Sequence, residues 1–382
     1  MSLEITLVGA RVLTPDGWSE APVGLAEGRL VAGGSGREVD LSGYLVLPGI
    51  VDPHGDGFER HMAPRRGALR EAEHGVVAAA AELAANGITT AILAQFFSWE
   101  GGMRGPDFAE HVFESVTAVR DAVPVDLRLQ LRLETHLLDD FARAEAAVDR
   151  FGIDYVVFND HLPHQRLAEG RKPPRLTGQA LKSGRSPETH LALMQNLHER
   201  TSEVPAALDA LTARLFQKAI VLGSHDDSTP ENRREWAARG ATVSEFPETL
   251  EAAQAAREDG AHIVLGAPNV VRGASHAGNI AASELVAHGL CDALASDYHY
   301  PSPLRAAFRL EELGLCDLAS AWAMLSSGPA QMLGLADRGT LEIGKRADLI
   351  VVDPTTRRVE ATIAAGRVAH LTGTVAERFL RS

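Results

Sequence analysis

The chain has 382 residues, a formal net charge of −14 and two cysteines, Cys291 and Cys316. Its length allows two or three domains, although α/β barrels often exceed about 250 residues as one domain. The acidic charge argues against nonspecific binding to nucleic acid or to a membrane surface, so an anionic substrate would need a local basic patch or metal ions. Two cysteines make no disulfide framework, which favours a reducing cytoplasm. We also find no apolar run of about 18 residues for a membrane span and no signal-peptide pattern at the start.

Both ends of the chain are expected to form β structure. Residues 1–50 contain short apolar segments separated by turns, and residues 340–382 have the same character. These two segments most simply meet as one small β domain. Residues 51–339 would then form a single larger domain between them.

That middle region alternates helices with apolar strands, and a glycine follows each of the expected helices. The helices are expected at residues 71–86, 230–239, 247–259 and 280–288, with Ser228 or Thr229 capping the second. Strand candidates lie at 46–52, 88–95, 127–134, 155–160, 219–224, 241–246, 262–267 and 293–296. Eight such βα units predict a (β/α)8 barrel of the TIM type, whose active site lies at the C-terminal ends of the strands. A doubly wound open sheet is the alternative, but no Gly-x-Gly-x-x-Gly turn supports it.

The first strand carries the most informative motif of the chain. His54 and Asp56 are one residue apart at the end of an apolar strand that contains Pro48-Gly49. In a strand, residues i and i+2 point to the same side, so an imidazole and a carboxylate could bind one cation there. The motif therefore indicates a metal site rather than incidental polarity.

Further polar residues occupy the other predicted strand ends, and their common placement makes the metal hypothesis specific. They are Glu134, His136, Asp160, His161, His225, Asp226, Asp227, Glu245 and Asp297. Imidazole and carboxylate ligands suit Zn²⁺, with Mn²⁺ or Fe²⁺ as alternatives, and a pair of ions could share a bridging carboxylate. Metalloenzymes with this barrel often use a carboxylated lysine as the bridge. None of the four lysines lies at a barrel strand end, so Glu134 is the best bridging candidate.

Several of these residues have alternative roles. His136 and Asp226 could be hydrogen-bond partners of ligands, and Asp160 could orient His161. Asp297 could cap a helix or could orient and deprotonate a metal-bound water. The remaining histidines, among them His198, are interpreted as surface or core residues.

Basic residues gather after the same strand ends and favour a polyanionic substrate, because guanidinium groups match phosphate oxygens bidentately. The candidate substrate ligands are Arg60, His61, Arg65, Arg166 and Arg272, with Arg66, Arg171, Lys172 and Arg175 nearby. Solvated loop charge is the alternative interpretation for any one of them.

The motifs together resemble the amidohydrolase superfamily, and more closely its branch in bacterial phosphonate breakdown, the ribose 1-methylphosphonate 5-triphosphate diphosphatases. The resemblance is carried by residues 47–67, 132–136, 158–166, 223–229, 245–249, 266–279 and 296–298. The H-x-D at 54–56, in place of the usual H-x-H of the superfamily, is the sharpest feature.

The resemblance implies a metal-dependent hydrolase that cleaves a ribose 5-triphosphate to the 5-phosphate and pyrophosphate. It implies metal ligands at His54, Asp56, Glu134, His225 and Asp297, and also at His161, with Asp297 and Glu134 as catalytic groups. The chain departs from the family at Gly55, Gly57, His164 and His299-Tyr300. These positions border the expected pocket.

Three hypotheses follow. In the first, metal-bound hydroxide attacks phosphorus and arginines neutralise the departing pyrophosphate of a phosphorylated sugar. In the second, the same centre hydrolyses a C–N bond, as in deacetylases and cyclic amidases. The third is a scaffold without catalytic activity, disfavoured because the ligand set is intact. The sequence leaves open whether the chain forms a homo-oligomer.

Overall fold

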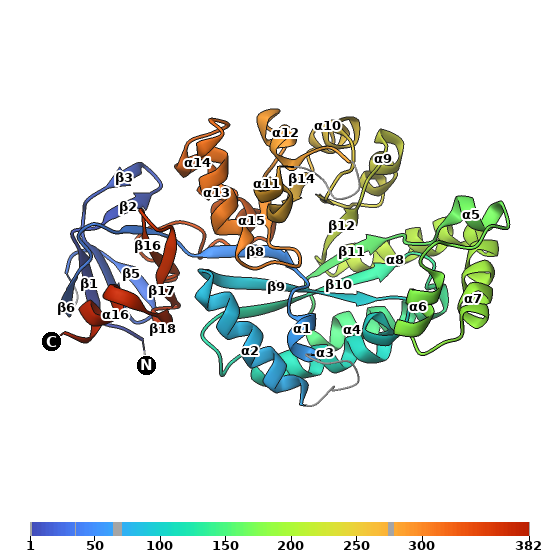
Figure 1. Ribbon diagram of the computed structural model, residues 1–382, viewed down its shortest axis with the longest axis horizontal. Coiled ribbons are helices and arrows are strands. Elements are labelled where there is room, and N and C mark those ends of the chain that lie inside the picture. Colours follow the sequence, from blue (N-terminus) through green and yellow to red (C-terminus); the bar gives the residue numbers. More distant parts are fainter. Residues whose placement is uncertain (1, 35, 64–70, 274–278, 382) are drawn as a thin grey trace. The chain divides into compact units, whose positions relative to one another are not determined.

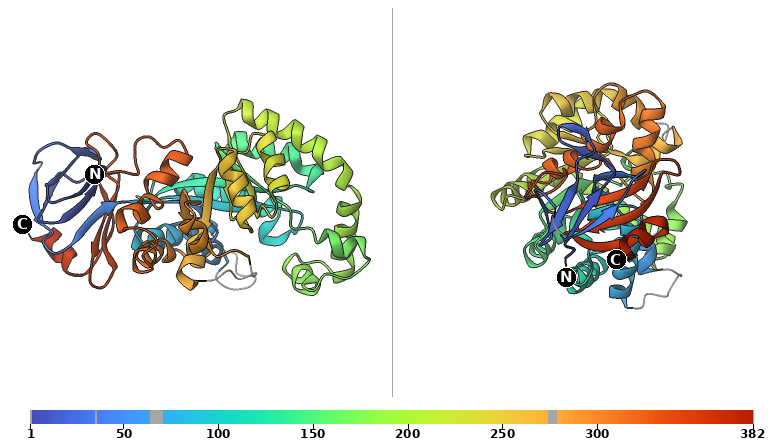
Figure 2. Two further views of the ribbon diagram at one scale, coloured as in Figure 1. Left: turned by 90° about the horizontal axis from the view of Figure 1, so that it is seen from above. Right: turned by 90° about the vertical axis from the view of Figure 1, so that its left-hand side faces the viewer.

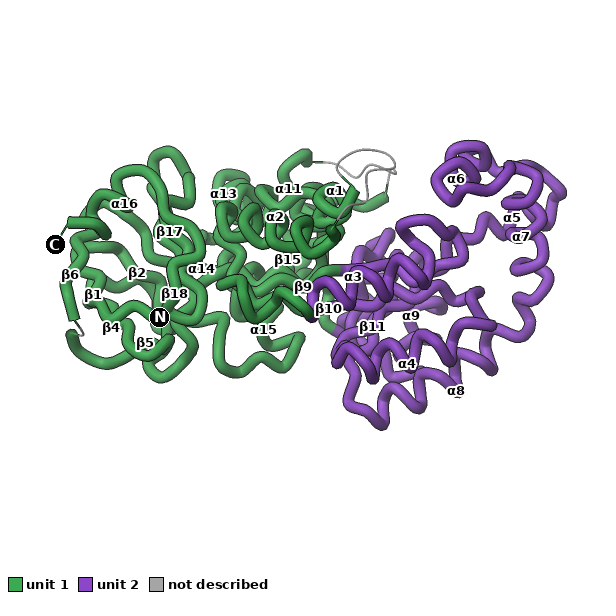
Figure 3. Tube along the Cα trace, turned by 90° about the horizontal axis from the view of Figure 1, so that it is seen from below, with its two compact units in different colours: residues 1–93, 118–128, 262–382 green, residues 94–117, 129–261 purple. Residues whose placement is uncertain are grey.

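The computed structural model describes residues 2–34, 36–63, 71–273 and 279–381. These residues divide into two compact units (Figure 3). Unit 1 comprises residues 1–93, 118–128 and 262–382, and unit 2 comprises residues 94–117 and 129–261.

Within the described residues, one sheet holds eight parallel strands in chain order, as the barrel hypothesis predicted (Figure 1). They are β8 Ile50–Gly55, β9 Ile88–Phe97, β10 Asp126–Glu134, β11 Tyr155–Asn159, β12 Val221–His225, β13 Val243–Glu245, β14 His262–Gly266 and β15 Ala293–Ala295. In unit 1, a further bridge joins Gly55 to Asp297, just beyond β15. The strands thus form a nearly closed (β/α)8 barrel, and the doubly wound alternative is wrong.

Strands from both ends of the chain form two further sheets in unit 1. The smaller, in the order β5-β4-β1-β6, contains β1 Ile5–Val8, β4 Val23–Ala26, β5 Arg29–Val31 and β6 Arg37–Asp40. The larger, β18-β17-β16-β7-β2-β3, contains β2 Arg11–Thr14, β3 Gly17–Ser19, β7 Leu45–Pro48, β16 Leu349–Asp353, β17 Arg358–Ala364 and β18 Arg367–Leu371. Blue and red strands therefore lie together in Figure 2. Leu25, Val46, Leu349 and Val351 belong to their shared apolar core.

The first predicted strand, residues 46–52, is wrong in one respect, because it is two strands in different sheets. β7 ends at Pro48 and pairs with β16, whereas β8 begins at Ile50 and pairs with β9. Proline has no N–H to continue a ladder. At Gly49 the backbone passes so close to Thr89 that a Cβ would lie 2.3 Å from its Oγ1. The Pro-Gly pair therefore separates β7, in the six-stranded sheet, from β8, in the barrel.

The predicted helices are present with small shifts at their starts. Thr229 caps α9 (Pro230–Ala238) by accepting a hydrogen bond of 3.2 Å from Asn232 N. α10 (Leu250–Glu258) begins three residues later than expected, because Thr249 is its cap and accepts from Ala252 N at 3.1 Å. The other two are α2 Ala72–Ala85 and α12 Ala282–Ala287.

The chain contains further helices, and three of them, α5 to α7, form an insertion between β11 and α8 in unit 2. The helices not yet named are α1 Glu59–Met62, α3 Pro106–Val119, α4 Phe141–Phe151, α5 His164–Ala168, α6 Leu176–Lys182, α7 Pro187–Glu199, α8 Val204–Gln217, α11 Ala267–Arg272, α13 Ser302–Glu312, α14 Leu318–Ala323, α15 Ser327–Met332 and α16 Gly373–Leu380. Short 3₁₀ turns lie at Gly102–Arg104, Leu138–Asp140 and Thr201–Glu203. Among the described residues, none of the helices has the length and apolar character needed to cross a membrane.

Candidate metal centre

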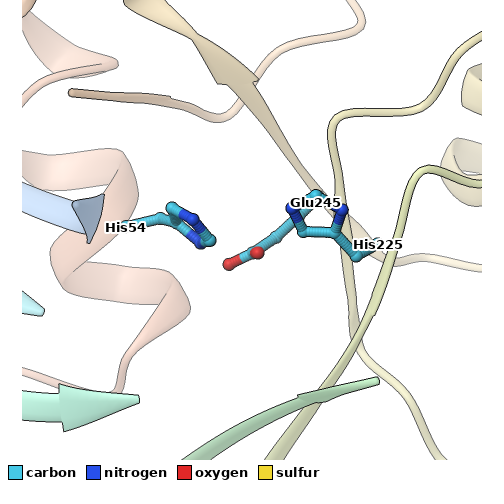
Figure 4. Close-up of side chains that lie close together, drawn as sticks. All are labelled: His54, His225 and Glu245. Carbon is cyan, nitrogen blue, oxygen red and sulfur yellow. The ribbon is translucent and has the colours of Figure 1, made fainter. Parts of the chain in front are cut away.

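Three of the predicted metal ligands are joined by main-chain hydrogen bonds in unit 1. His54 is fully buried at the end of β8 (Figure 4). Asp297 N donates to His54 O at 3.0 Å, and Asp56 N donates to Asp297 O at 3.0 Å. β8 ends at Gly55, so Asp56 lies just beyond the strand. The main chain of Asp297 is therefore hydrogen-bonded to both His54 and Asp56.

Left-handed backbone conformations follow three of the barrel strands. Asp226 follows β12 with φ 59°, Phe246 follows β13 with φ 54°, and Asp297 lies two residues after β15 with φ 54°. Residues with a Cβ rarely adopt such angles, and strained positions of this kind cluster at active sites. Three of the strand ends expected to carry the site, those of β12, β13 and β15, are therefore followed by a strained residue.

Asp52, which the sequence analysis did not single out, fixes the strand that carries His54. Its carboxylate is fully buried and accepts hydrogen bonds from Ser296 N at 2.8 Å and Ser296 Oγ at 2.5 Å. Burial raises the pKa of Asp52 to about 7, against the hydrogen bonds from Ser296, which lower it. The pair ties β8 to the residue that follows β15.

The departures at Gly55, Gly57 and Tyr300 belong to one packed arrangement in unit 1. A Cβ on Gly55 would lie 2.8 Å from Asp52 Oδ2 and 2.9 Å from Ser296 Oγ. A Cβ on Gly57 would lie 3.2 Å from Cζ of Tyr300, whose side chain is fully buried. Larger residues at the two glycines would have to displace these groups, so the glycines and Tyr300 depend on one another.

In unit 2, Glu134 and His161 form the centre of a second group. Glu134 is fully buried at the end of β10, and its Oε1 contacts His161 Nδ1. Trp99 Nε1 donates to the other oxygen, Oε2, at 3.1 Å. Burial lowers the pKa of His161, but the carboxylate of Glu134 outweighs it and raises that pKa. With Glu100, the pair offers one nitrogen and two oxygens within 4.8 Å of one another.

His225 lies next to Glu245 on adjacent strands of unit 2, and Figure 4 shows their side chains at the ends of β12 and β13. His225 Nε2 is 3.0 Å from Arg132 Nη2, and its Nδ1 is 3.0 Å from Asp226 Oδ2. Burial lowers the pKa of His225, which favours the neutral imidazole that binds metal. Burial raises the pKa of the Asp226 carboxyl group. The hydrogen bond and charge of His225, with the charge of Arg132, have the larger combined effect and lower that pKa to about 2.

The donors in both units fit a divalent cation of the zinc or manganese class. Imidazole nitrogens and carboxylate oxygens are the ligands these ions take in proteins. In unit 2, Glu100, Glu134 and His161 meet the spacing such an ion requires. In unit 1, main-chain hydrogen bonds hold His54, Asp56 and Asp297 together. The convergence of the two sets on one centre remains a prediction.

Comparison with known proteins agrees with this chemistry. The profile of the Amidohydrolase family matches residues 58–370. The chain belongs to the amidohydrolase family. A relative from Escherichia coli (strain K12), named alpha-D-ribose 1-methylphosphonate 5-triphosphate diphosphatase, is 35% identical over 327 residues, which cover 82% of this chain and 84% of the relative.

Solved structures of amidohydrolase fold resemble the chain over nearly its full length. A Xaa-Pro dipeptidase with bound methionine in the active site has a TM-score of 0.64 at 14% identity, covering 96% of this chain and 99% of the other. The N-acyl-D-glutamate deacylase of Bordetella bronchiseptica, complexed with zinc and a phosphonate inhibitor, has a TM-score of 0.59 at 16% identity and covers 96% of each chain. At these identities the likeness shows the fold alone.

Two of the predicted substrate ligands of this amidohydrolase already have a carboxylate partner. Arg60 and His61 of α1 both contact Glu82 of α2, the latter with His61 Nε2 2.6 Å from Glu82 Oε2. Arg60 also donates to the carbonyl of Tyr298 at 3.1 Å. A phosphate bound there would have to share these cations with Glu82.

The remaining basic candidates differ in their setting. Arg166 on α5 and Arg272 on α11 are exposed. Exposed positions also hold Arg171, Lys172 and Arg175. Arg65 and Arg66 lie outside the described residues.

Sequence reasoning missed the groups that surround the ligands of this family. Arg132 is 4% exposed, lies 3.9 Å from the ring centre of Phe96 and reaches His225. Trp99 and Glu100 follow β9 and meet Glu134. For Arg132 a signal existed, because it precedes Glu134 by two residues and so faces the same side of β10. For Trp99 and Glu100 only the tertiary structure brings the contact.

The sequence suggests Asp160 as a residue that orients His161, but its contacts are with other histidines. His161 meets Glu134, whereas Asp160 lies against His164 and, at 3.6 Å, against His136. A cavity of about 390 Å³ in unit 2 is lined by His136, Asp160, His161, His164 and His225, among other residues. The cavity therefore joins the candidate metal ligands of unit 2 to a separate group of histidines.

Proposed function

We propose that the chain is a metal-dependent hydrolase that converts ribose 1-methylphosphonate 5-triphosphate to the 5-phosphate and pyrophosphate. The observation that carries this proposal is the 35% identity, over 82% of the chain, to a relative that bears the name of this activity. The donor set of both units supports a metal-dependent reaction of that kind.

The proposed ligands are His54, Asp56, Glu134, His161, His225 and Asp297. Bound divalent cations would supply a nucleophile at neutral pH and would stabilise charge on phosphoryl oxygens. Glu134 is proposed as the bridging carboxylate, since it is buried and has His161 on one of its oxygens. Arg132 and Asp226 contact the two ring nitrogens of His225, so one of these contacts would have to be displaced when His225 binds an ion.

Asp297 is the proposed proton acceptor. In the hydrolysis, the oxygen of one water forms a bond to phosphorus, the bridging P–O bond breaks, and pyrophosphate leaves. The water must lose a proton, and a strand-end carboxylate is the group best suited to take it. The main chain of Asp297 is hydrogen-bonded to the main chains of both His54 and Asp56. These bonds fix the position of the backbone from which the Asp297 side chain extends.

The substrate is proposed to be held by the basic residues Arg60, His61, Arg65, Arg166 and Arg272. Arg60 and His61 both contact the carboxylate of Glu82. A bound phosphate would therefore have to compete with Glu82 for these two side chains. The net charge of −14 makes such local cations necessary for a polyanion.

The proposal is tested by incubating metal-loaded protein with ribose 5-triphosphates and with simple N-acyl substrates. Phosphorus NMR and mass spectrometry would identify the products. We expect pyrophosphate and the ribose 5-phosphate product, and no cleavage of N-acyl compounds. Release of single phosphates, or cleavage of N-acyl compounds alone, would overturn the proposal in favour of another reaction on the same fold.

A further inference from the structure

Three polar side chains meet in the cavity of unit 2 beside the proposed catalytic ligands. His136 follows β10, Asp160 follows β11, and His164 is the first residue of α5. His136 is buried with 3% exposure, His164 is partly buried, and the Asp160 side chain is 41% exposed. None of the three belongs to the set His54, Asp56, Glu134, His161, His225 and Asp297.

Their spacing is that of ligands around a single ion. His136 Nδ1 lies 3.6 Å from Asp160 Oδ1, and His164 Nε2 lies 3.0 Å from Asp160 Oδ2. One ligand atom from each residue can be chosen so that all lie within 4.8 Å of one another. Ligand atoms at about 2.0–2.2 Å from a tetrahedral zinc ion are about 3.3–3.6 Å apart. The three side chains would thus need only small adjustments.

The other ring nitrogens of both histidines have partners that hold the imidazoles in place. His164 Nδ1 is 2.8 Å from His198 Nδ1, and His136 Nε2 is 3.3 Å from Thr201 Oγ1. Metal-binding histidines commonly use their second nitrogen in this way, which fixes the ring and its tautomer. The hydroxyl of Thr135, 3.1 Å from His136 Nδ1, is the contact that an ion would replace.

We propose that His136, Asp160 and His164 form an accessory site for one divalent transition-metal ion of the zinc class. Two imidazoles and one carboxylate select such an ion over magnesium or calcium, which prefer all-oxygen ligands. All three residues line the cavity that His161 and His225 also line. The site does not depend on which reaction the protein catalyses.

The test measures metal content, with an exposed histidine as control. Wild type, His164→Asn, Asp160→Asn and the control His111→Asn, on α3, would be loaded with Zn²⁺, dialysed and analysed for zinc per chain. We expect His164→Asn and Asp160→Asn each to lose about one equivalent while the control keeps the wild-type content. Unchanged zinc content in both folded variants, as judged by circular dichroism and thermal melting, would overturn the proposal.

A second measurement needs no variant. Crystals of the wild type grown with Zn²⁺ would be measured at the zinc absorption edge. We expect an anomalous peak between His136, Asp160 and His164, resolved from any peak beside Glu134. Density at Glu134 without a peak among the three side chains would refute the accessory site and leave the proposed function intact.

Discussion

The indole Nε1 of Trp99 donates a hydrogen bond to Oε2 of Glu134, 3.1 Å away, while the other carboxylate oxygen contacts His161. We therefore expect Trp99→Phe to weaken the hold on this buried carboxylate. The loss should be about 1–2 kcal/mol in the free energy of unfolding, together with weaker metal retention. Urea unfolding and metal analysis would measure both. Trp18→Phe, on β3, is the control, and equal effects of the two changes would contradict the role of Trp99.

Glu134→Gln is expected to lower the occupancy of one metal ion, because an amide oxygen bridges two ions poorly. Loss of a residue that only hydrogen-bonds to a metal ligand already lowers metal affinity or activity by about 10- to 100-fold. For the bridging ligand itself we therefore expect turnover to fall by about 100-fold or more. Metal stoichiometry and kinetics on a ribose triphosphate would check this. Glu73→Gln, on the exposed face of α2, is the matched control. If stoichiometry and turnover both survive in Glu134→Gln, the bridging role is wrong.

Arg60→Gln is expected to raise KM for a ribose triphosphate by about tenfold or more, since a charge-assisted phosphate contact is worth about 1.5–3 kcal/mol. Metal content should stay constant. Glu82→Gln offers the informative comparison, because it removes the carboxylate that holds Arg60. We expect its KM to be equal to or below that of the wild type. A KM that rises equally in both variants would mean that the pair acts only through structure.

The other basic candidates can be ranked in the same assay. Arg166→Gln and Arg272→Gln should raise KM if these exposed residues bind phosphate, and the wild-type affinity should fall with added salt. Should neither variant alter KM or turnover, solvated surface charge is the correct interpretation for both residues.

The pH dependence of stability has a defined sign at Glu110. Arg143 donates to both of its oxygens, at 2.8 and 3.0 Å, and these hydrogen bonds hold the pKa of Glu110 below its ordinary value of 4.5. The unfolded chain therefore binds this proton more readily, so the contribution is complete above the ordinary pKa and is lost as the pH falls through the folded one. Glu110→Gln should cost about 0.5–1 kcal/mol at pH 7 and less than that at pH 3. Urea unfolding at both pH values measures this, and an equal loss at the two would contradict it.

Local pattern predicted the barrel strands and the cap of α9 well, because each depends on residues close in sequence, whereas the Thr249 cap of α10 was missed. The apolar runs located the strands, and Thr229 before Pro230 located α9. The break at Gly49 was missed, since it depends on the approach of Thr89 from another strand.

The same distinction holds at the site. The strand-end rule selected His54, Glu134 and His225 correctly as residues at the ends of barrel strands. It could not reveal Glu82 beside Arg60 or Trp99 beside Glu134, because those contacts join separate elements. Nor did it assign the insertion that brings His198 to His164, where no strand-end pattern applies.

The pairing of β16 with β7, in which Leu349 lies opposite Pro48, sets an order of events during synthesis. These residues are about 300 positions apart, and all eight barrel strands lie between them. The six-stranded sheet can be completed only after every barrel strand has left the ribosome. Until then the edge of β7 that pairs with β16 has no partner strand, although all four residues of β7 are buried in the finished fold. Nascent chains halted before residue 349 should therefore depend on chaperones far more than the finished protein does.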